Sequence, residues 1–218
     1  MAQQQKTLQK IVALYALLLL GLGFLIGTYS DAMPQWYTNW FSSRSYAFFL
    51  TTVFLLGAVF LLLPWNWARF VRLPSRRAIL LGQAKELYRW AAITVGLWFL
   101  FAVGGGVALY GTPPAAATLF RIGASYLLSC FLMANLLLIF RASSRKALRY
   151  APGLTVFLLV LIDVEILFLE LPMGIGARVY LIFSWVLYEG ILGPLVLAGL
   201  WLATLWYLLT VSKKRDLL

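Results

Sequence analysis

Four acidic residues stand in the last two of the chain's long apolar segments. Asp163, Glu165 and Glu170 lie in one segment, and Glu189 lies in the next. A carboxylate in the hydrocarbon of a membrane is costly, so each one needs a proton, a cation or a basic partner. Two carboxyl groups at close range cannot both ionise cheaply, so they share a proton or hold a cation. These residues therefore predict proton or cation chemistry inside a membrane.

Asp163 and Glu189 are the first candidates for such a site. Each lies about ten residues into its apolar segment, from opposite ends, so both fall near mid-membrane if the segments are antiparallel. No basic residue lies at that depth. Glu165 is about 200° around the helix from Asp163. We expect Glu165 to hold a proton or to hydrogen-bond to a polar side chain of another segment: Ser125, Ser129 or Asn135.

Glu170 has a simpler structural interpretation. It follows Asp163 by seven residues and shares its helix face within about 20°. Arg121 and Arg178 stand at the same side of the membrane in the neighbouring segments. We expect Glu170 to form a structural ion pair with Arg121 or Arg178.

The elements that carry these residues are six long apolar runs. The chain has 218 residues, is 63% hydrophobic and carries a net charge of +11, whereas a soluble domain is about half apolar. Most runs have the roughly 17–25 residues that a membrane helix requires. We expect an all-α polytopic membrane protein, a single transmembrane domain over residues 1–218, with spans near 11–29, 46–65, 90–110, 119–140, 154–171 and 179–211.

The basic residues give the orientation of this bundle. All of the 18 lysines and arginines except Arg44, Arg121 and Arg178 fall on one side of the predicted spans. Lysine and arginine accumulate on the cytoplasmic side of membrane proteins. We therefore expect both termini in the cytoplasm, which requires an even number of spans, and a location in a bacterial cytoplasmic membrane.

Three further segments carry expectations about packing. Residues 75–89 predict an amphipathic helix at the inner interface, alone or continuous with span 90–110. Its Arg76, Arg77, Lys85 and Arg89 would contact anionic lipid headgroups or a cytoplasmic partner subunit. Trp36, Tyr37, Trp40 and Phe41 predict an aromatic belt on a short helix that lies on the outer membrane surface. Small residues predict close helix crossings at Gly23, Gly27, Gly57 and Gly104 to Gly106.

The last run, 179–211, is about a dozen residues too long for one straight span. It contains Gly190, Gly193 and Pro194. Two arrangements fit: one long tilted helix kinked at Pro194, or a short re-entrant segment followed by a full span. Unwound helix at these residues would expose carbonyl groups that coordinate cations.

Composition excludes several classes of function. The chain has no histidine, and Cys130 is its only cysteine. Bis-histidine haem, thiolate iron–sulfur clusters, structural zinc and the usual His-containing zinc sites lack ligands, and a Ser–His or Cys–His nucleophile is impossible. We expect no cofactor and no metal site. The basic residues punctuate membrane spans rather than gather on a soluble fold, which disfavours nucleic-acid binding.

Three functions remain open. The first is a transport protein or permease subunit, coupled to protons or cations through Asp163 and Glu189. The second is a non-catalytic subunit or assembly factor of a larger membrane complex, with lipids, a partner subunit or a second copy as its contacts. The third is an intramembrane enzyme of lipid or isoprenoid chemistry. Asp163 and Glu165 do not converge on a helix, and this disfavours the enzyme.

Overall fold

The computed structural model describes residues 2–28, 33–42, 45–62, 76–143, 183–186 and 190–215. These residues are almost entirely helical and contain no strand, which confirms the all-α prediction for this part of the chain. Four of the described helices are long and apolar enough to cross a membrane, and they indicate a membrane protein. They are α1 (Ala2–Thr28), α6 (Arg76–Tyr110), α7 (Ala116–Ser143) and α10 (Leu192–Arg215).

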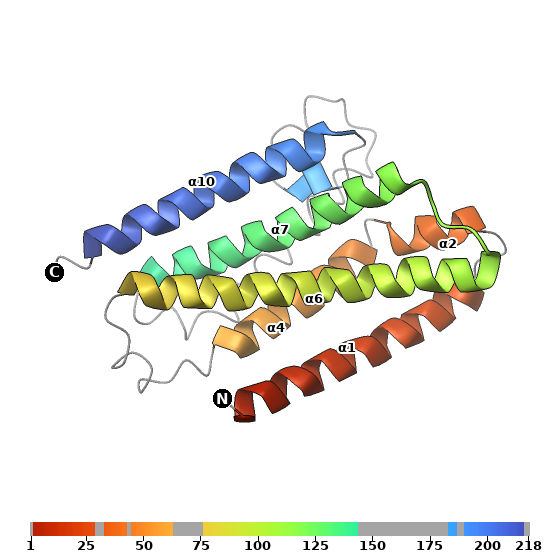
Figure 1. The fold of residues 1–218 in the computed structure, drawn as a ribbon, viewed down its shortest axis with the longest axis horizontal. Helices are drawn as coiled ribbons and strands as arrows, with labels where there is room; N and C mark the ends of the chain where they lie inside the picture. Colours follow the sequence, from red (N-terminus) through yellow and green to blue (C-terminus); the bar gives the residue numbers. More distant parts are fainter. Residues whose placement is uncertain are drawn as a thin grey trace.

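The helices lie side by side along α6 (Figure 1). Helix α1 flanks α6 on one side, and α7 and α10 lie on the other. Both chain termini are at the same end of the bundle, together with the Arg76 end of α6. This arrangement puts the Arg76 end of α6 and the Arg215 end of α10 at the same end of the bundle. The side of the membrane that this end faces remains a prediction, as does the count of six spans, because 154–171 lies outside the described ranges.

Helix α6 unites two predicted elements. The amphipathic segment expected at 75–89 continues without interruption into the span expected at 90–110. The helix has 35 residues, which is about 52 Å of α-helix against about 30 Å of membrane hydrocarbon. Its surplus length carries Lys85 and Arg89, both exposed, out of the span at the end that holds the termini.

After α1 the chain runs back along the bundle through three short helical elements, and we call this part of the chain the second traverse. Helix α2 (Met33–Trp40) is followed by a π-helix, η1 (Tyr46–Thr51), and by α4 (Thr52–Leu62). Figure 1 shows α2 and α4 following one another along α6, with α2 near the end opposite the termini. The traverse thus begins at Met33, well before the predicted span 46–65, and it is interrupted between Trp40 and Ser45.

Helix α2, the short helix expected here, turns its aromatic rings into the bundle, so the prediction that these rings form an outer aromatic belt was wrong. Trp36, Tyr37 and Trp40 are only 3%, 8% and 0% exposed. Their rings pack against α6, where the indole Nε1 of Trp36 donates a hydrogen bond to the carbonyl of Ala102 at 2.7 Å. Aromatic rings suit a helical core as well as a membrane interface, and composition does not distinguish the two.

The glycines of α1 and α6 make room for these rings. A Cβ atom on Gly105 would lie 2.8 Å from Cζ2 of Trp36, and a Cβ on Gly27 would lie 3.6 Å from Cζ3 of the same ring. Gly23 is similarly placed, 3.5 Å from Cζ2 of Trp40. Trp36 is therefore wedged between α1 and α6. The small residues predicted to let two helices cross instead accept aromatic side chains of a third.

The last apolar run is not one continuous helix. Its described residues form a 3-10 turn, η2 (Phe183–Val186), and a separate helix, α10, which begins only at Leu192. Gly190 has a φ of +123°, a conformation that favours glycine. Pro194 lies in the first turn of α10, where its missing N–H has no partner within the helix. The kinked-helix arrangement is thus excluded, and the re-entrant one concerns residues outside the described ranges.

Gly57 provides a direct test of the packing. A Cβ atom at this position would overlap the indole ring of Trp90, which is buried and held by a hydrogen bond from its Nε1 to the carbonyl of Phe54 at 3.1 Å. We expect Gly57→Ala to lower the free energy of unfolding by about 1–3 kcal/mol, as overpacking does. Unfolding of the purified protein by SDS in mixed micelles measures the change.

Gly96→Ala is the matched control for this substitution. Gly96 lies on the exposed face of α6, where an added Cβ meets no atom within 4 Å. We expect this variant to be neutral or slightly more stable because alanine favours helix. Equal stability of the Gly57→Ala and Gly96→Ala proteins would contradict the packing of Trp90 against α4.

Candidate functional site at the broken second traverse

The predicted ion chemistry depends on residues outside the described ranges, and it stays a prediction. These residues are Asp163, Glu165, Glu170, Arg178 and Glu189. Within the described part of the chain the only carboxylate is Glu86, which is exposed on α6. No group of three or more acidic, cysteine or histidine side chains there could hold a metal ion.

The described basic residues for which the sequence predicted contacts lie on two helices, α6 and α7. Lys85 and Arg89 are exposed on α6, as contact with lipid headgroups or a partner would require. Arg76 and Arg77 form the first turn of the same helix, and the structure does not describe their side chains. Arg121 is half-buried in the second turn of α7, where it already makes an interaction of its own.

The interruption of the second traverse is stabilised by local hydrogen bonds. The Ser45 hydroxyl donates to the carbonyl of Asn39 at 2.6 Å, and the Ser42 hydroxyl donates to the same carbonyl at 3.0 Å. The backbone N–H of Ser45 donates in turn to Oγ of Ser42 at 3.2 Å. Serine and asparagine bond in this way where a helix stops. The π-helix that follows is a rare conformation, frequent at functional sites.

This interruption lies alongside the middle of the long helices. Tyr46 donates from Oη to Oγ of Ser129 at 3.0 Å, and Ser129 is near the centre of α7. The rings of Trp40 and Trp98 meet edge to face, 4.9 Å apart, well inside α6. Irregular backbone at membrane depth is tolerated only where protein covers it or where it lines a watery space.

Unbonded polar atoms surround the interruption. Among the described residues, five buried side-chain atoms have no hydrogen-bond partner: Nε1 of Trp40, Oγ1 of Thr51, Nε1 of Trp98, Oγ of Ser125 and Oη of Tyr126. Leaving such a group unsatisfied costs about 1–3 kcal/mol. All five can donate a hydrogen bond, and the two indole groups can only donate.

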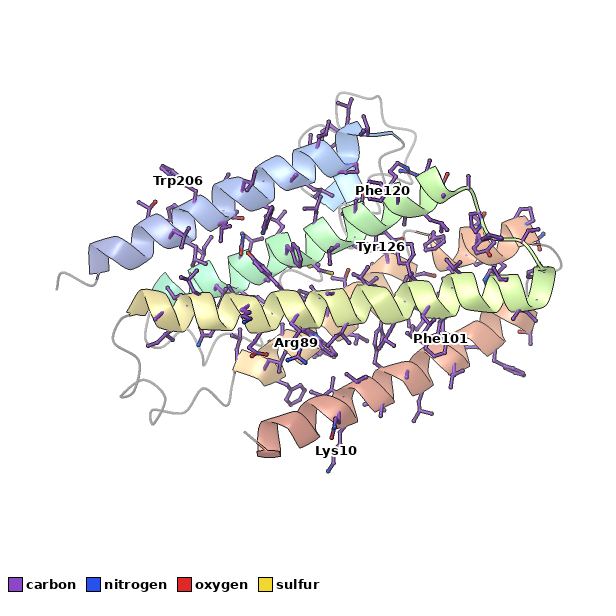
Figure 2. The ribbon with its side chains drawn as sticks, viewed as in Figure 1. Lys10, Arg89, Phe101, Phe120, Tyr126 and Trp206 are labelled. Carbon is purple, nitrogen blue, oxygen red and sulfur yellow. The ribbon has the colours of Figure 1, made fainter. Side chains whose placement is uncertain are left out.

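Three of these five residues make aromatic contacts, Trp40 with Trp98 and Tyr126 with Phe41, and Ser125 precedes Tyr126 on α7. Phe41 follows Trp40 and contacts Phe99 at 5.3 Å and Tyr126 at 6.4 Å between ring centroids. Tyr126 also contacts Phe99 at 6.3 Å and Tyr46 at 5.0 Å. Figure 2 shows Tyr126 on the bundle side of α7, whereas Phe120 and Trp206 point outward. We call this set the break cluster: Trp40, Phe41, Tyr46, Trp98, Phe99, Ser125 and Tyr126.

A second polar group, nearer the termini, has all its hydrogen bonds in place. Tyr88 of α6 donates from Oη to Oδ1 of Asn135 at 2.6 Å, and Trp201 of α10 donates from Nε1 to Oη of Tyr88 at 3.1 Å. The amide of Asn135 donates to the carbonyl of Trp201 at 3.2 Å and to Oγ1 of Thr204 at 3.0 Å. This network fixes α6, α7 and α10 against one another and leaves no donor for a ligand.

Sequence reasoning missed both polar groups. It offered Ser125, Ser129 and Asn135 as partners for Glu165, but Ser129 accepts from Tyr46 and Asn135 bonds to α6 and α10. Only Ser125 lacks a partner. The available signal was the polar stretch of Asn39, Ser42 and Ser45 between two aromatic runs, which marks a helix end.

The closed network predicts coupling between Tyr88 and Asn135. A double-mutant cycle of Tyr88→Phe and Asn135→Leu should show a coupling energy of about 0.6–1.7 kcal/mol, the range for hydrogen bonds inside membrane proteins. SDS unfolding of the four proteins measures it. Tyr88→Phe combined with Thr210→Val is the control, since the Thr210 hydroxyl bonds only within α10. Additive effects in both cycles would exclude the network as an interhelical link.

No protein-family model, curated protein or solved structure matches this chain.

Proposed function

We propose that the protein is a membrane transport protein, or a permease subunit, that passes a polar solute through the break cluster. One observation carries the proposal: the second traverse is broken beside the middle of α6 and α7, next to buried donors without partners. Discontinuous helices of this kind form the substrate sites of many secondary transporters. A purely structural bundle gains nothing from buried unsatisfied groups.

The intramembrane carboxylates supply a coupling step in this proposal. Asp163 and Glu189 alternate between protonated and ionised states, or between cation-bound and empty states, as solute binds and leaves. Glu189 precedes Gly190, whose positive φ marks the start of the break before α10. A change of charge at Glu189 would therefore act directly on the junction from which α10 begins.

The hydrogen-bonded network restricts where movement takes place. Tyr88, Asn135 and Trp201 hold three helices together nearer the end of the bundle that carries the termini. Helix α2 and the start of α10 lie toward the opposite end. Opening of the bundle is thus expected at that end, where α2 and the Leu192 end of α10 are free of this network.

A non-catalytic membrane subunit is the second candidate. Helices α1 and α10 are the least covered of the four spans, with 22% and 17% of their apolar windows buried against 56% for α7. Two uncovered apolar faces suit a protein that assembles with membrane partners. In this case changes on these faces would disrupt co-purification, while neutral replacements of the acids would have little effect.

Ion binding tests the transport proposal. Purified protein in nanodiscs is titrated with sodium and, separately, with protons, for the wild type and for Asp163→Asn/Glu189→Gln. We expect a saturable signal in the wild type that is lost in the double variant because both carboxylates of the site are gone. The thermal unfolding of the two proteins is measured in parallel.

Glu86→Gln is the control, because it removes one exposed carboxylate on α6 that lies outside the predicted site, whereas the double variant removes two. It should retain ion binding. Equal titrations for all three folded proteins would overturn the coupling site and favour the subunit.

A further inference from the structure

We infer that the exposed face of α6 binds one anionic phospholipid at the end of the bundle that holds the termini. Lys85 and Arg89 hold the phosphate of the headgroup, and an acyl chain lies along Ala92 and Gly96. The sequence left two contacts open for these cations, lipid headgroups and a partner subunit, and this inference chooses the lipid. It is independent of the proposed transport, because a lipid site suits a transporter and a membrane subunit equally.

The two cations lie at the depth of the lipid headgroups. Residues 90–110 of α6 carry no charged side chain and extend about 31 Å, which matches the roughly 30 Å of membrane hydrocarbon. Arg89 therefore stands at the boundary of the hydrocarbon, and Lys85 stands about 6 Å beyond it, within the headgroup layer. Both side chains are exposed, and neither makes an ion pair or hydrogen bond with another described residue.

Two small residues continue the helix face that carries these cations. Ala92 follows Lys85 by seven residues, and Gly96 follows Arg89 by seven. Each small residue therefore lies within about 20° of its cation around the helix. Both are exposed, and a Cβ atom on Gly96 would meet no atom within 4 Å. Glycine is less favourable than alanine inside a helix, and no neighbouring side chain requires it here. The face thus leaves room for an acyl chain next to the two charges.

The charge on this face favours a lipid over a second copy of the chain. In a symmetric pair a face meets itself, so two copies would bring Lys85 and Arg89 of one against the same residues of the other. Such like-charge contacts are costly. Glu86, the only described carboxylate, stands three residues before Arg89, and this turn stays positive even when Glu86 is counted. Basic side chains near the membrane surface attract anionic lipids.

Lys10 of α1 provides a matched charge outside the site. Tyr15 donates to the carbonyl of Thr94 at 3.4 Å, and α1 and α6 both begin at the end that holds the termini. Lys10 precedes Tyr15 by five residues, as Arg89 precedes Thr94, so the two exposed cations stand at about the same depth. Lys10 lies about 140° around α1 from Tyr15, and Figure 2 shows it on the side of α1 away from α6.

Native mass spectrometry of the delipidated full chain tests the inference, because it counts bound lipids and copies of the chain together. The protein in neutral detergent is titrated with phosphatidylglycerol and with phosphatidylcholine of identical acyl chains. We expect one phosphatidylglycerol to bind more tightly than phosphatidylcholine. Each cation near the surface contributes about fivefold, so Lys85→Gln/Arg89→Gln should raise the Kd for phosphatidylglycerol about 30-fold, and Lys10→Gln should change it less than about twofold.

A pair of glycines tests the placement of the acyl chain. Gly96 of α6 and Gly199 of α10 are both exposed, with no atom within 4 Å of an added Cβ. Gly96→Leu should raise the Kd for phosphatidylglycerol severalfold because its side chain fills the space beside the two cations. Gly199→Leu should leave the Kd unchanged. Glycerol 3-phosphate, which has the phosphate without the acyl chains, should not displace the lipid.

All variants should keep the wild-type unfolding midpoint in lipid-free detergent, since no described residue bonds to the replaced side chains. The inference is overturned by equal affinity for the two lipids, by a loss as large in Lys10→Gln as in the double variant, or by displacement of the lipid with glycerol 3-phosphate. Equal affinity of the Gly96→Leu and Gly199→Leu proteins also overturns it. A dimer that forms in place of lipid binding, and is lost in Gly96→Leu, would assign the face to a second copy instead.

Discussion

A polar group inside a membrane must find its partner within the protein, and this constraint governs the bundle. Its tyrosine and tryptophan side chains meet the constraint by donating to backbone carbonyls of other helices. Tyr15 of α1 reaches Thr94 at 3.4 Å, Trp36 reaches Ala102 at 2.7 Å, and Trp90 reaches Phe54 at 3.1 Å. Each hydrogen bond holds a large ring between two helices. The same side chain therefore fills space between the helices and fixes their position along one another.

The break cluster is the place where this constraint is not met. Its aromatic rings pack closely, yet its indole and hydroxyl groups lack the partners that similar groups find elsewhere in the bundle. The wedge of Trp36 between the glycines of α1 and α6 holds α2 inside the bundle, and the interruption that follows α2 lies beside the middle of α6 and α7. The well-packed helices around Trp36 thus position the break cluster, whose polar groups lack hydrogen-bond partners. Functional sites are commonly held in this way by a rigid scaffold.

Hydropathy was sufficient to find most of the described long helices. The spans expected at 90–110 and 119–140 fall within α6 and α7, and the one expected at 11–29 overlaps α1 up to its last residue, Thr28. This agreement arises because membrane thickness sets the length of an apolar run. The side each helix turns inward was not predictable, since lipid-facing and core-facing residues are equally apolar. This is why Trp36 and Trp40 were placed on the membrane surface although they are buried.

The break itself was missed for a related physical reason. A helix eight residues long carries too few apolar residues to register as part of a span, so the traverse was expected to begin at residue 46. The polar partners were equally hidden, because the bond from Tyr88 to Asn135 joins residues far apart in sequence. Composition indicated that Asn135 needs a partner, and only the packing of α6, α7 and α10 identifies which.

The most direct test of the account is whether water reaches the break from outside the membrane. A membrane-impermeant maleimide is applied to single-cysteine proteins in a Cys130→Ala background, in sealed vesicles. Ser42→Cys, at the interruption, should react although it lies deep along the bundle, and Leu56→Cys, exposed on the lipid-facing side of α4, should not. Failure of Ser42→Cys to react before the protein is unfolded would contradict a solute path through the break cluster.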